Sequence, residues 1–105
     1  MTKYLVLYRS KLTAAEQMAQ GTPEQAQAGM EAWTAWAERA GDAIVDLGTP
    51  LQVVESGGDG GDPIGGYSIL QADSPDALAK VLDGHPHITE GGTIETLEVL
   101  TVPGM

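Results

Sequence analysis

The spacing of hydrophobic residues predicts a strand near the start of the chain. Residues 3–9, KYLVLYR, hold five apolar residues in a row, with β-branched or aromatic side chains at Tyr4, Val6 and Tyr8, a composition typical of strands. The run is continuous rather than alternating, which indicates a strand that is buried on both faces of its sheet. Both faces of that sheet therefore need a cover.

A different spacing predicts a helix over residues 23–40. Thr22 is the candidate N-cap, Pro23 suits the first helical position, and Gln25 completes a capping box. Gly41 is the expected end of the helix. One apolar stripe at helical spacing is made of Ala26, Met30, Trp33, Ala37 and Ala40, with Trp36 on its flank.

The remaining patterns predict further strands and helices. Ser74 is the N-cap of another helix, which has Pro75 at its first position and ends at Gly84. Strands are expected at 43–47, 67–72 and 93–102, and an extended segment at 51–55 can continue the second strand. We also expect a short helix at 13–20 and a loop at 85–92.

The resulting order, β-α-β-β-α-β, predicts an α+β fold of the ferredoxin-like type, with an antiparallel sheet and both helices on one of its faces. The chain has 105 residues, which fits a single domain over 1–105. The last expected strand carries apolar residues on both sides, Ile94 on one and Leu97 on the other. A second copy of the chain, packed sheet against sheet, is the simplest cover for the second face, so we expect a homodimer.

Composition and charge narrow the classes of function. The net charge is −10, which argues against nucleic acid and anionic membranes as partners. No apolar stretch is long enough for a membrane span or a signal peptide, and cysteine is absent, so we expect a cytoplasmic protein without disulfides. Arg9 and Lys11 lie in a segment without acids; they either meet a small anionic ligand or are solvated charges beside a strand.

Two histidines are the best candidates for chemistry. His85 and His87 flank Pro86 just after a helix end, and histidine suits proton transfer near neutral pH. Each ring can instead simply pack or hydrogen-bond in a loop. A third ligand is not evident, so no metal site is expected. Trp33 and Trp36 either fill the core or line a ligand platform.

Other polar features leave alternatives open. The glycine-rich stretch 56–66 lacks the phosphate-loop pattern and carries two aspartates, so it is either a hairpin connection or a lid over a pocket. Tyr8 and Tyr67 lie on expected strands, and each phenol needs a polar partner if it is buried. Asp46 interrupts an apolar strand, either at an edge or facing a cavity, and Ser68 has no evident base beside it.

Several segments together resemble one known family. They are YLVLYR at the start, a W-x-x-W helix, GDPIGGYSILQADSPDALAKVLDGHPH and GGTIETLEVLTVPGM, and they cover nearly the whole chain. On these motifs the chain resembles the YCII-related (DGPF-type) family. The resemblance implies a ferredoxin-like domain that dimerises as an α+β barrel. The family includes a dehydrochlorinase of a chlorinated hydroquinone and members associated with extracytoplasmic-function sigma factors.

The YciI branch of that family has a proposed active site made of a helix-1 His, an Asp in an Asp-Pro-Tyr turn and a strand Ser, and this chain departs from all three. The helix position falls near Glu31 to Trp33, where there is no His. His85 stands in place of the Asp, and Tyr67 aligns with the Ser. A carboxylate at Glu31 and a base at His85 would form the same pair with its members exchanged, so these two are the candidate catalytic residues. The candidate ligand-binding residues are Tyr8, Trp33, Tyr67 and His87.

Two functions remain open from the sequence. One is an enzyme of the lyase or isomerase type, without a cofactor, in which a histidine moves protons of a small aromatic or lactone-like molecule in an apolar pocket. The other is a dimeric small-molecule-binding or regulatory module without turnover, in which the histidines only orient a ligand or hold the turn. The family resemblance links such a module to sigma-factor regulation. The absence of the His-Asp-Ser triad favours the second.

Overall fold

The computed structural model of the chain describes residues 1–12, 16, 19–55 and 62–103. Most of the short helix expected over 13–20, and the glycine-rich residues 56–61, lie outside the described residues. The elements run in the order β1 (Thr2–Arg9), α2 (Pro23–Ala40), the 3-10 turn η1 (Gly41–Ala43), β2 (Ile44–Asp46), β3 (Ile64–Ala72), α3 (Pro75–Leu82), α4 (Pro86–Thr89) and β4 (Thr93–Glu98).

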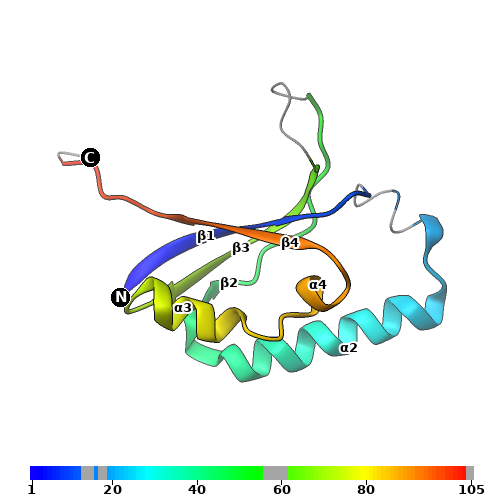
Figure 1. Ribbon diagram of the computed structural model, residues 1–105, viewed down its shortest axis with the longest axis horizontal. Helices are drawn as coiled ribbons and strands as arrows, with labels where there is room; N and C mark the ends of the chain where they lie inside the picture. Colours follow the sequence, from blue (N-terminus) through cyan, green and yellow to red (C-terminus); the bar gives the residue numbers. More distant parts are fainter. Residues whose placement is uncertain (13–15, 17–18, 56–61, 104–105) are drawn as a thin grey trace.

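Four strands form one antiparallel sheet in the order β2-β3-β1-β4. β1 is central and pairs with β3 along its whole length, from Thr2 opposite Ala72 to Arg9 opposite Ile64. Figure 1 shows the three α-helices together on one side of the sheet. This arrangement confirms the α+β, ferredoxin-like fold predicted from the sequence.

The core lies between the helices and one face of the sheet. Tyr4, Val6 and Tyr8 alternate along β1 and are at most 4% exposed, as the two-residue period of a strand requires. The other buried apolar residues of the core are Trp36, Leu70, Ala72, Leu78 and Leu82. The inward face of β1 therefore packs against large side chains of α2 and α3.

Helix α2 begins and ends where the sequence predicts. The Thr22 hydroxyl accepts the backbone N–H of Gln25, and the Gln25 side chain accepts the Thr22 N–H, which satisfies two N–H groups at the helix start. Its apolar stripe is buried only in part, because Met30 is 70% exposed. The 18 residues of α2 span about 27 Å, and its N-terminal turns extend past the sheet in Figure 1. The sheet therefore covers only the C-terminal half of α2.

A short helix, α4, occupies part of the segment expected to be a loop. The expectation of a loop over 85–92 is wrong for Pro86–Thr89. Pro86 takes the first helical position and the ring of His85 acts as the N-cap. Histidine is not among the usual N-cap residues, which explains why the sequence pattern does not reveal this helix.

The last strand is shorter than expected, and residues 51–55 form no strand. β4 ends at Glu98, and one further bond joins the Val99 N–H to the Lys3 carbonyl. Residues 99–102 then leave the sheet, so the predicted strand over 93–102 is correct only in its first part. In the 51–55 segment, the Leu51 N–H donates to the Gly65 carbonyl, and no continuous ladder follows.

The face of the sheet away from the helices is apolar at its centre. Leu5 lies between Ile69 on β3 and Leu97 on β4, and directly paired residues share a face. Leu97 is 41% exposed, and Val45 on β2 is 44% exposed. Within the described residues no helix covers this face (Figure 1). The structure thus bears out an apolar second face.

Asp46 ends the edge strand β2 and holds the turn that follows it. Its Oδ1 accepts the Gly48 N–H at 2.9 Å, and the Tyr67 hydroxyl donates to its Oδ2 at 3.5 Å. Of the two alternatives for Asp46, the edge position is therefore the correct one. Gly48 has φ of 83°, and a Cβ there would lie 1.7 Å from the Tyr67 carbonyl oxygen, so the turn admits only glycine.

We predict that Gly48→Ala lowers the free energy of unfolding by at least about 2 kcal/mol, because the new Cβ combines an unfavourable φ with a backbone collision. Urea unfolding followed by circular dichroism measures this change. Gly29→Ala in α2 is the matched control, since nothing lies within 4 Å of a Cβ there. The control should stabilise the protein by about 0.5–1 kcal/mol; a Gly48→Ala variant as stable as the wild type would contradict the turn.

Candidate functional site

His85 lies at the centre of the candidate site, at the start of α4. Gly84, with φ of 71°, and Pro86 set the backbone on either side of it. The side chain is fully buried, and its Nδ1 accepts the backbone N–H of His87 at 3.0 Å. Because Nδ1 is an acceptor, the neutral ring carries its proton on Nε2.

Three aromatic side chains enclose the His85 ring. Tyr8 stacks on it with ring centroids 5.1 Å apart, and Trp33 and Trp36 approach to 4.5 and 4.4 Å at steep angles. The Nε2 atom is buried and has no hydrogen-bond partner among the described residues. His85 therefore holds a polar N–H inside an aromatic cluster.

The surroundings of His85 disfavour its charged form. Burial is the largest cause, and the positive charges of His87 and Arg39 add to it; together they lower the pKa of His85 to about 4. The ring is therefore neutral at pH 7. With Nδ1 used in the helix cap, His85 offers a hydrogen-bond donor rather than a base.

A buried serine supplies the polar partner of Tyr8. The Tyr8 hydroxyl donates to Ser68 Oγ at 2.7 Å, and Ser68 Oγ donates to the Leu47 carbonyl at 2.6 Å. Burial raises the pKa of Tyr8, and the hydrogen bond with Ser68 opposes that rise. The chain of bonds fixes the Tyr8 ring against His85 and leaves Ser68 without a base, as expected.

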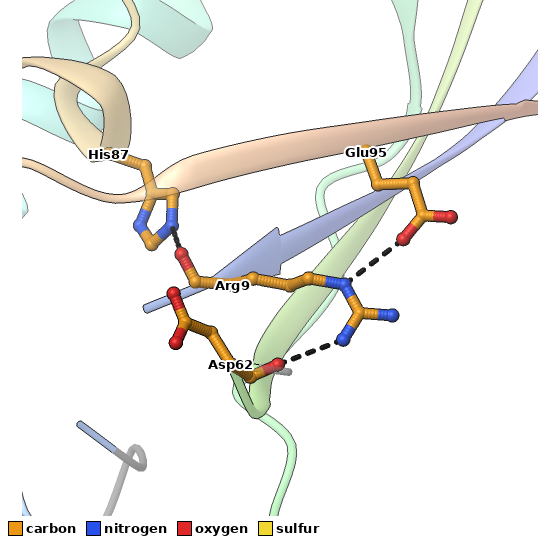
Figure 2. Close-up of polar contacts among 4 residues, drawn as sticks. All are labelled: Arg9, Asp62, His87 and Glu95. Atoms are coloured by element: carbon orange, nitrogen blue, oxygen red, sulfur yellow. Dashed lines mark hydrogen bonds and ion pairs between the residues drawn. The ribbon is translucent and has the colours of Figure 1, made fainter. Parts of the chain in front are cut away.

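His87 is only half buried and has a different pattern of contacts. Its Nε2 lies 2.7 Å from the Arg9 carbonyl oxygen, which can only accept, so the neutral ring carries its proton on Nε2. Figure 2 shows the other ring nitrogen on the far side of the imidazole from Arg9. Its ring also packs on Gly92, where a Cβ would lie 2.3 Å from Nε2. His87 therefore presents Nδ1 as an acceptor, whereas His85 holds a donor.

The Arg9 side chain is engaged by the protein itself. Its Nε donates to Glu95 Oε1 at 3.0 Å in an ion pair, and its guanidinium also donates to the Asp62 carbonyl at 2.9 Å (Figure 2). These contacts fix the end of β1, where the Arg9 carbonyl accepts the hydrogen bond from His87. Of the two cations considered for an anionic ligand, Lys11 is left as the candidate.

A groove of about 820 Å³ lies beside His87. This volume is in the range of small-molecule sites. Its lining includes Ser10, Lys11, Gln25, His87, Glu90 and Gly92. The groove mixes polar side chains of both charge signs, and it is the concave surface that reaches the His87 ring.

The structure brings together some of the predicted site residues and separates others. Tyr8, Trp33, His85 and His87 lie in one cluster of ring contacts. Glu31 does not join them: it is exposed on α2, where its Oε1 accepts from Gln27 at 3.3 Å. Since Nδ1 of His85 bonds to His87 and its Nε2 has no partner among the described residues, the predicted Glu31–His85 pair is not formed.

Tyr67 is separated from the cluster by the sheet. It pairs with Leu7 on the face away from the helices, whereas the next residue, Ser68, points inward to Tyr8. Ser68 is thus the residue of β3 that faces Tyr8, and the contact between Gly92 and the His87 ring is not foreseen from the sequence. The alternation of residues along β3 was the available signal for Ser68. For Gly92, the only signal was the Gly91–Gly92 pair, because paired glycines allow another group to approach the backbone closely.

The described part of the chain has neither a metal-ligand cluster nor a helix suited to a membrane. No cluster of three or more His, Cys, Asp or Glu side chains suited to a metal ion occurs there. Nor does any helix in the described ranges combine the length and apolar character needed to cross a membrane.

Comparison with known proteins shows a likeness in fold. No family model and no curated protein matches the chain. A solved structure, 5-chloro-2-hydroxyhydroquinone dehydrochlorinase (TftG) from Burkholderia phenoliruptrix AC1100 in complex with 2,5-dihydroxybenzoquinone, matches with a TM-score of 0.50 and 21% identity. The match covers 88% of this chain and 90% of that chain. At this identity the likeness shows a shared fold.

We predict that His85 makes the protein less stable in acid. The pKa of His85 is lowered in the folded state, so below pH ~6.5 the unfolded chain binds a proton that the folded chain refuses until the pH falls through about 4. The stability that this group contributes is complete above pH ~6.5 and is lost between these values, at up to about 1.4 kcal/mol per pH unit. Urea unfolding at several pH values measures it.

His85→Asn provides the comparison, because an asparagine oxygen can still accept the His87 N–H but does not titrate. The difference in unfolding free energy between wild type and variant should therefore shrink as the pH falls from 7 to 4. A difference that stays constant over this range would show that His85 is not held neutral by the fold.

Proposed function

We propose that the protein is an enzyme of the lyase or isomerase type that needs no cofactor and moves a proton of a small aromatic or lactone-like molecule. The observation that carries this proposal is the fixed state of His87. Its Nε2–H is bound by the Arg9 carbonyl, its ring packs on Gly92 and borders an open groove, and no hydrogen bond reaches its Nδ1 within the described residues. A general base needs this combination of fixed direction and access.

In this proposal the two histidines have different roles. His87 accepts the proton at Nδ1, because its ring borders the groove and is only partly buried. His85, which is buried and has its Nδ1 occupied, donates from Nε2 to a polar atom of the ligand. Tyr8 and Trp33 supply aromatic walls, and Lys11 attracts a negatively charged group in the groove. Glu31 has no part.

Two related similarities support the class of reaction and substrate. The protein that shares the fold is named as a dehydrochlorinase of a hydroxylated chlorohydroquinone, with a dihydroxybenzoquinone bound. The motifs around GYSI, HPH and GGTIE resemble the YCII-related family, and we propose that the chain is a member of it. The likeness to a dehydrochlorinase favours a small planar molecule and a reaction that removes a proton.

The test is a screen of hydroxylated aromatic compounds and small lactones in D2O, with NMR detection of deuterium exchange and product. For any compound that is turned over, His87→Asn should lower kcat/KM at least about 100-fold, because general-base catalysis is typically worth that much. Gly92→Ala should also slow the reaction, since its Cβ displaces the His87 ring. Gly29→Ala is the control and should react like the wild type. Equal rates for His87→Asn and wild type would end the proposal.

The alternative is a binding or regulatory module without turnover. The specific observation in its favour is that the bond from the His87 N–H to His85 Nδ1 caps α4, so one histidine has a structural role already. A compound that stabilises the protein and is recovered unchanged, together with no deuterium exchange in the screen, would select this alternative.

We also propose that the protein is a homodimer joined through the face of the sheet that carries no helix. Leu5, Ile69 and Leu97 lie side by side there, with Val45 and Val99 exposed toward the edges. A contiguous apolar surface at the centre of a sheet is unusual in a monomer. The continuous apolar run of β1, with one side in the core and the other on this face, supports the same conclusion.

Sedimentation equilibrium at micromolar protein tests the dimer. The expected mass is twice the 10.9 kDa of one chain. Leu5→Lys places a charge at the centre of the proposed interface and should give a folded monomer, because an unpaired buried charge is strongly unfavourable. Met30→Lys, at an exposed position of α2, is the control and should remain dimeric. A wild-type protein of monomeric mass would refute the interface.

A further inference from the structure

Among the residues that the structure describes, the Nε2–H of His85 has no hydrogen-bond partner. The ring is fully buried, Nδ1 is bound to the His87 N–H, and Nε2 has no acceptor among the described residues. Leaving a buried donor unsatisfied costs about 1–3 kcal/mol. Such groups are uncommon in native proteins and call for an explanation.

The groups that surround this donor are aromatic. Tyr8, Trp33 and Trp36 all have ring centroids within 5.1 Å of the His85 ring. Aromatic walls around a single donor define a ligand with a flat ring and one hydrogen-bond acceptor. A neutral acceptor, such as a carbonyl or hydroxyl oxygen, fits this donor best, since His85 is uncharged at pH 7 and a carboxylate buried among aromatic rings would lose its hydration.

One of the three walls differs from the others in how it is held. Trp36 is 2% exposed and its indole N–H donates to the Val81 carbonyl at 3.0 Å. Tyr8 is 4% exposed and is bound to Ser68. Trp33 is only half buried, and no hydrogen bond to its indole occurs within the described residues. It also lies one turn from Met30, where α2 leaves the core. Trp33 is therefore the wall that can move.

We infer that Trp33 covers a ring-binding site whose hydrogen-bond donor is the Nε2–H of His85. Rotation of the Trp33 side chain toward solvent admits a small neutral aromatic ketone or phenol, whose ring takes the place of the indole against Tyr8 and whose oxygen accepts the Nε2–H. This inference rests on the proposed function in one respect, namely that the bound ring is a substrate. Because Tyr8 contacts both histidines, a ring bound here also lies near His87.

Acetophenone and α-methylstyrene are matched probes, because they have nearly the same shape and only the first has an acceptor oxygen. The Nε2–H of a buried imidazole exchanges slowly enough to be followed by proton NMR of the wild-type protein. Acetophenone at millimolar concentration should move this resonance downfield and show contacts to Trp33 and Tyr8, whereas α-methylstyrene should leave the resonance in place.

Trp33→Ala removes the cover and should tighten acetophenone binding at least about tenfold, because the closed state no longer competes with the ligand. Met30→Ala, one turn away and exposed, is the control and should bind like the wild type. The inference is overturned if acetophenone leaves the His85 resonance unchanged in the wild type, a result that holds even if Trp33→Ala fails to fold. No turnover is measured, so this outcome and the failure of His87 as a base are distinguishable.

Discussion

In the first turn of α4, the backbone N–H of His87 donates to Nδ1 of His85, and this bond decides which nitrogen of the His85 ring carries the proton. It places the proton of His85 on Nε2, inside an aromatic cluster. The side chain of His87, one residue after Pro86, reaches the Arg9 carbonyl. Pro86 between them restrains the backbone. One short helix thus turns two neighbouring histidines into a buried donor and an accessible acceptor.

The shape of the sheet determines where a ligand and a partner can meet the protein. The helices gather on one side (Figure 1), so the strands bury Tyr4, Val6 and Tyr8 there and leave an apolar surface on the other side. The site lies at the end of β1, where Arg9 directs its side chain to Glu95 and its carbonyl to His87 (Figure 2). The proposed ligand site and the proposed self-association therefore use opposite faces of the same strand.

Local signals in the sequence were sufficient for most of the fold. The capping box at Thr22 and the Pro75 helix start were correct because such signals act over three or four residues. The α4 helix was missed because its cap is an imidazole. Tyr67 was predicted as a ligand-binding residue, but neighbouring residues of a strand point to opposite faces of the sheet, so Ser68 faces Tyr8 and Tyr67 lies on the other face.

Periodicity and short-range capping were enough to predict the order of the four strands and of helices α2 and α3. They also predicted the second apolar face and the residue types of the site. Only the tertiary structure decided that Glu31 lies apart from His85, that Gly92 seats the His87 ring, and that Arg9 serves as a backbone acceptor. These contacts join residues from different elements, and most of them are far apart in the chain. Their distances follow from how α2, α4 and β1 pack together, which no local pattern records.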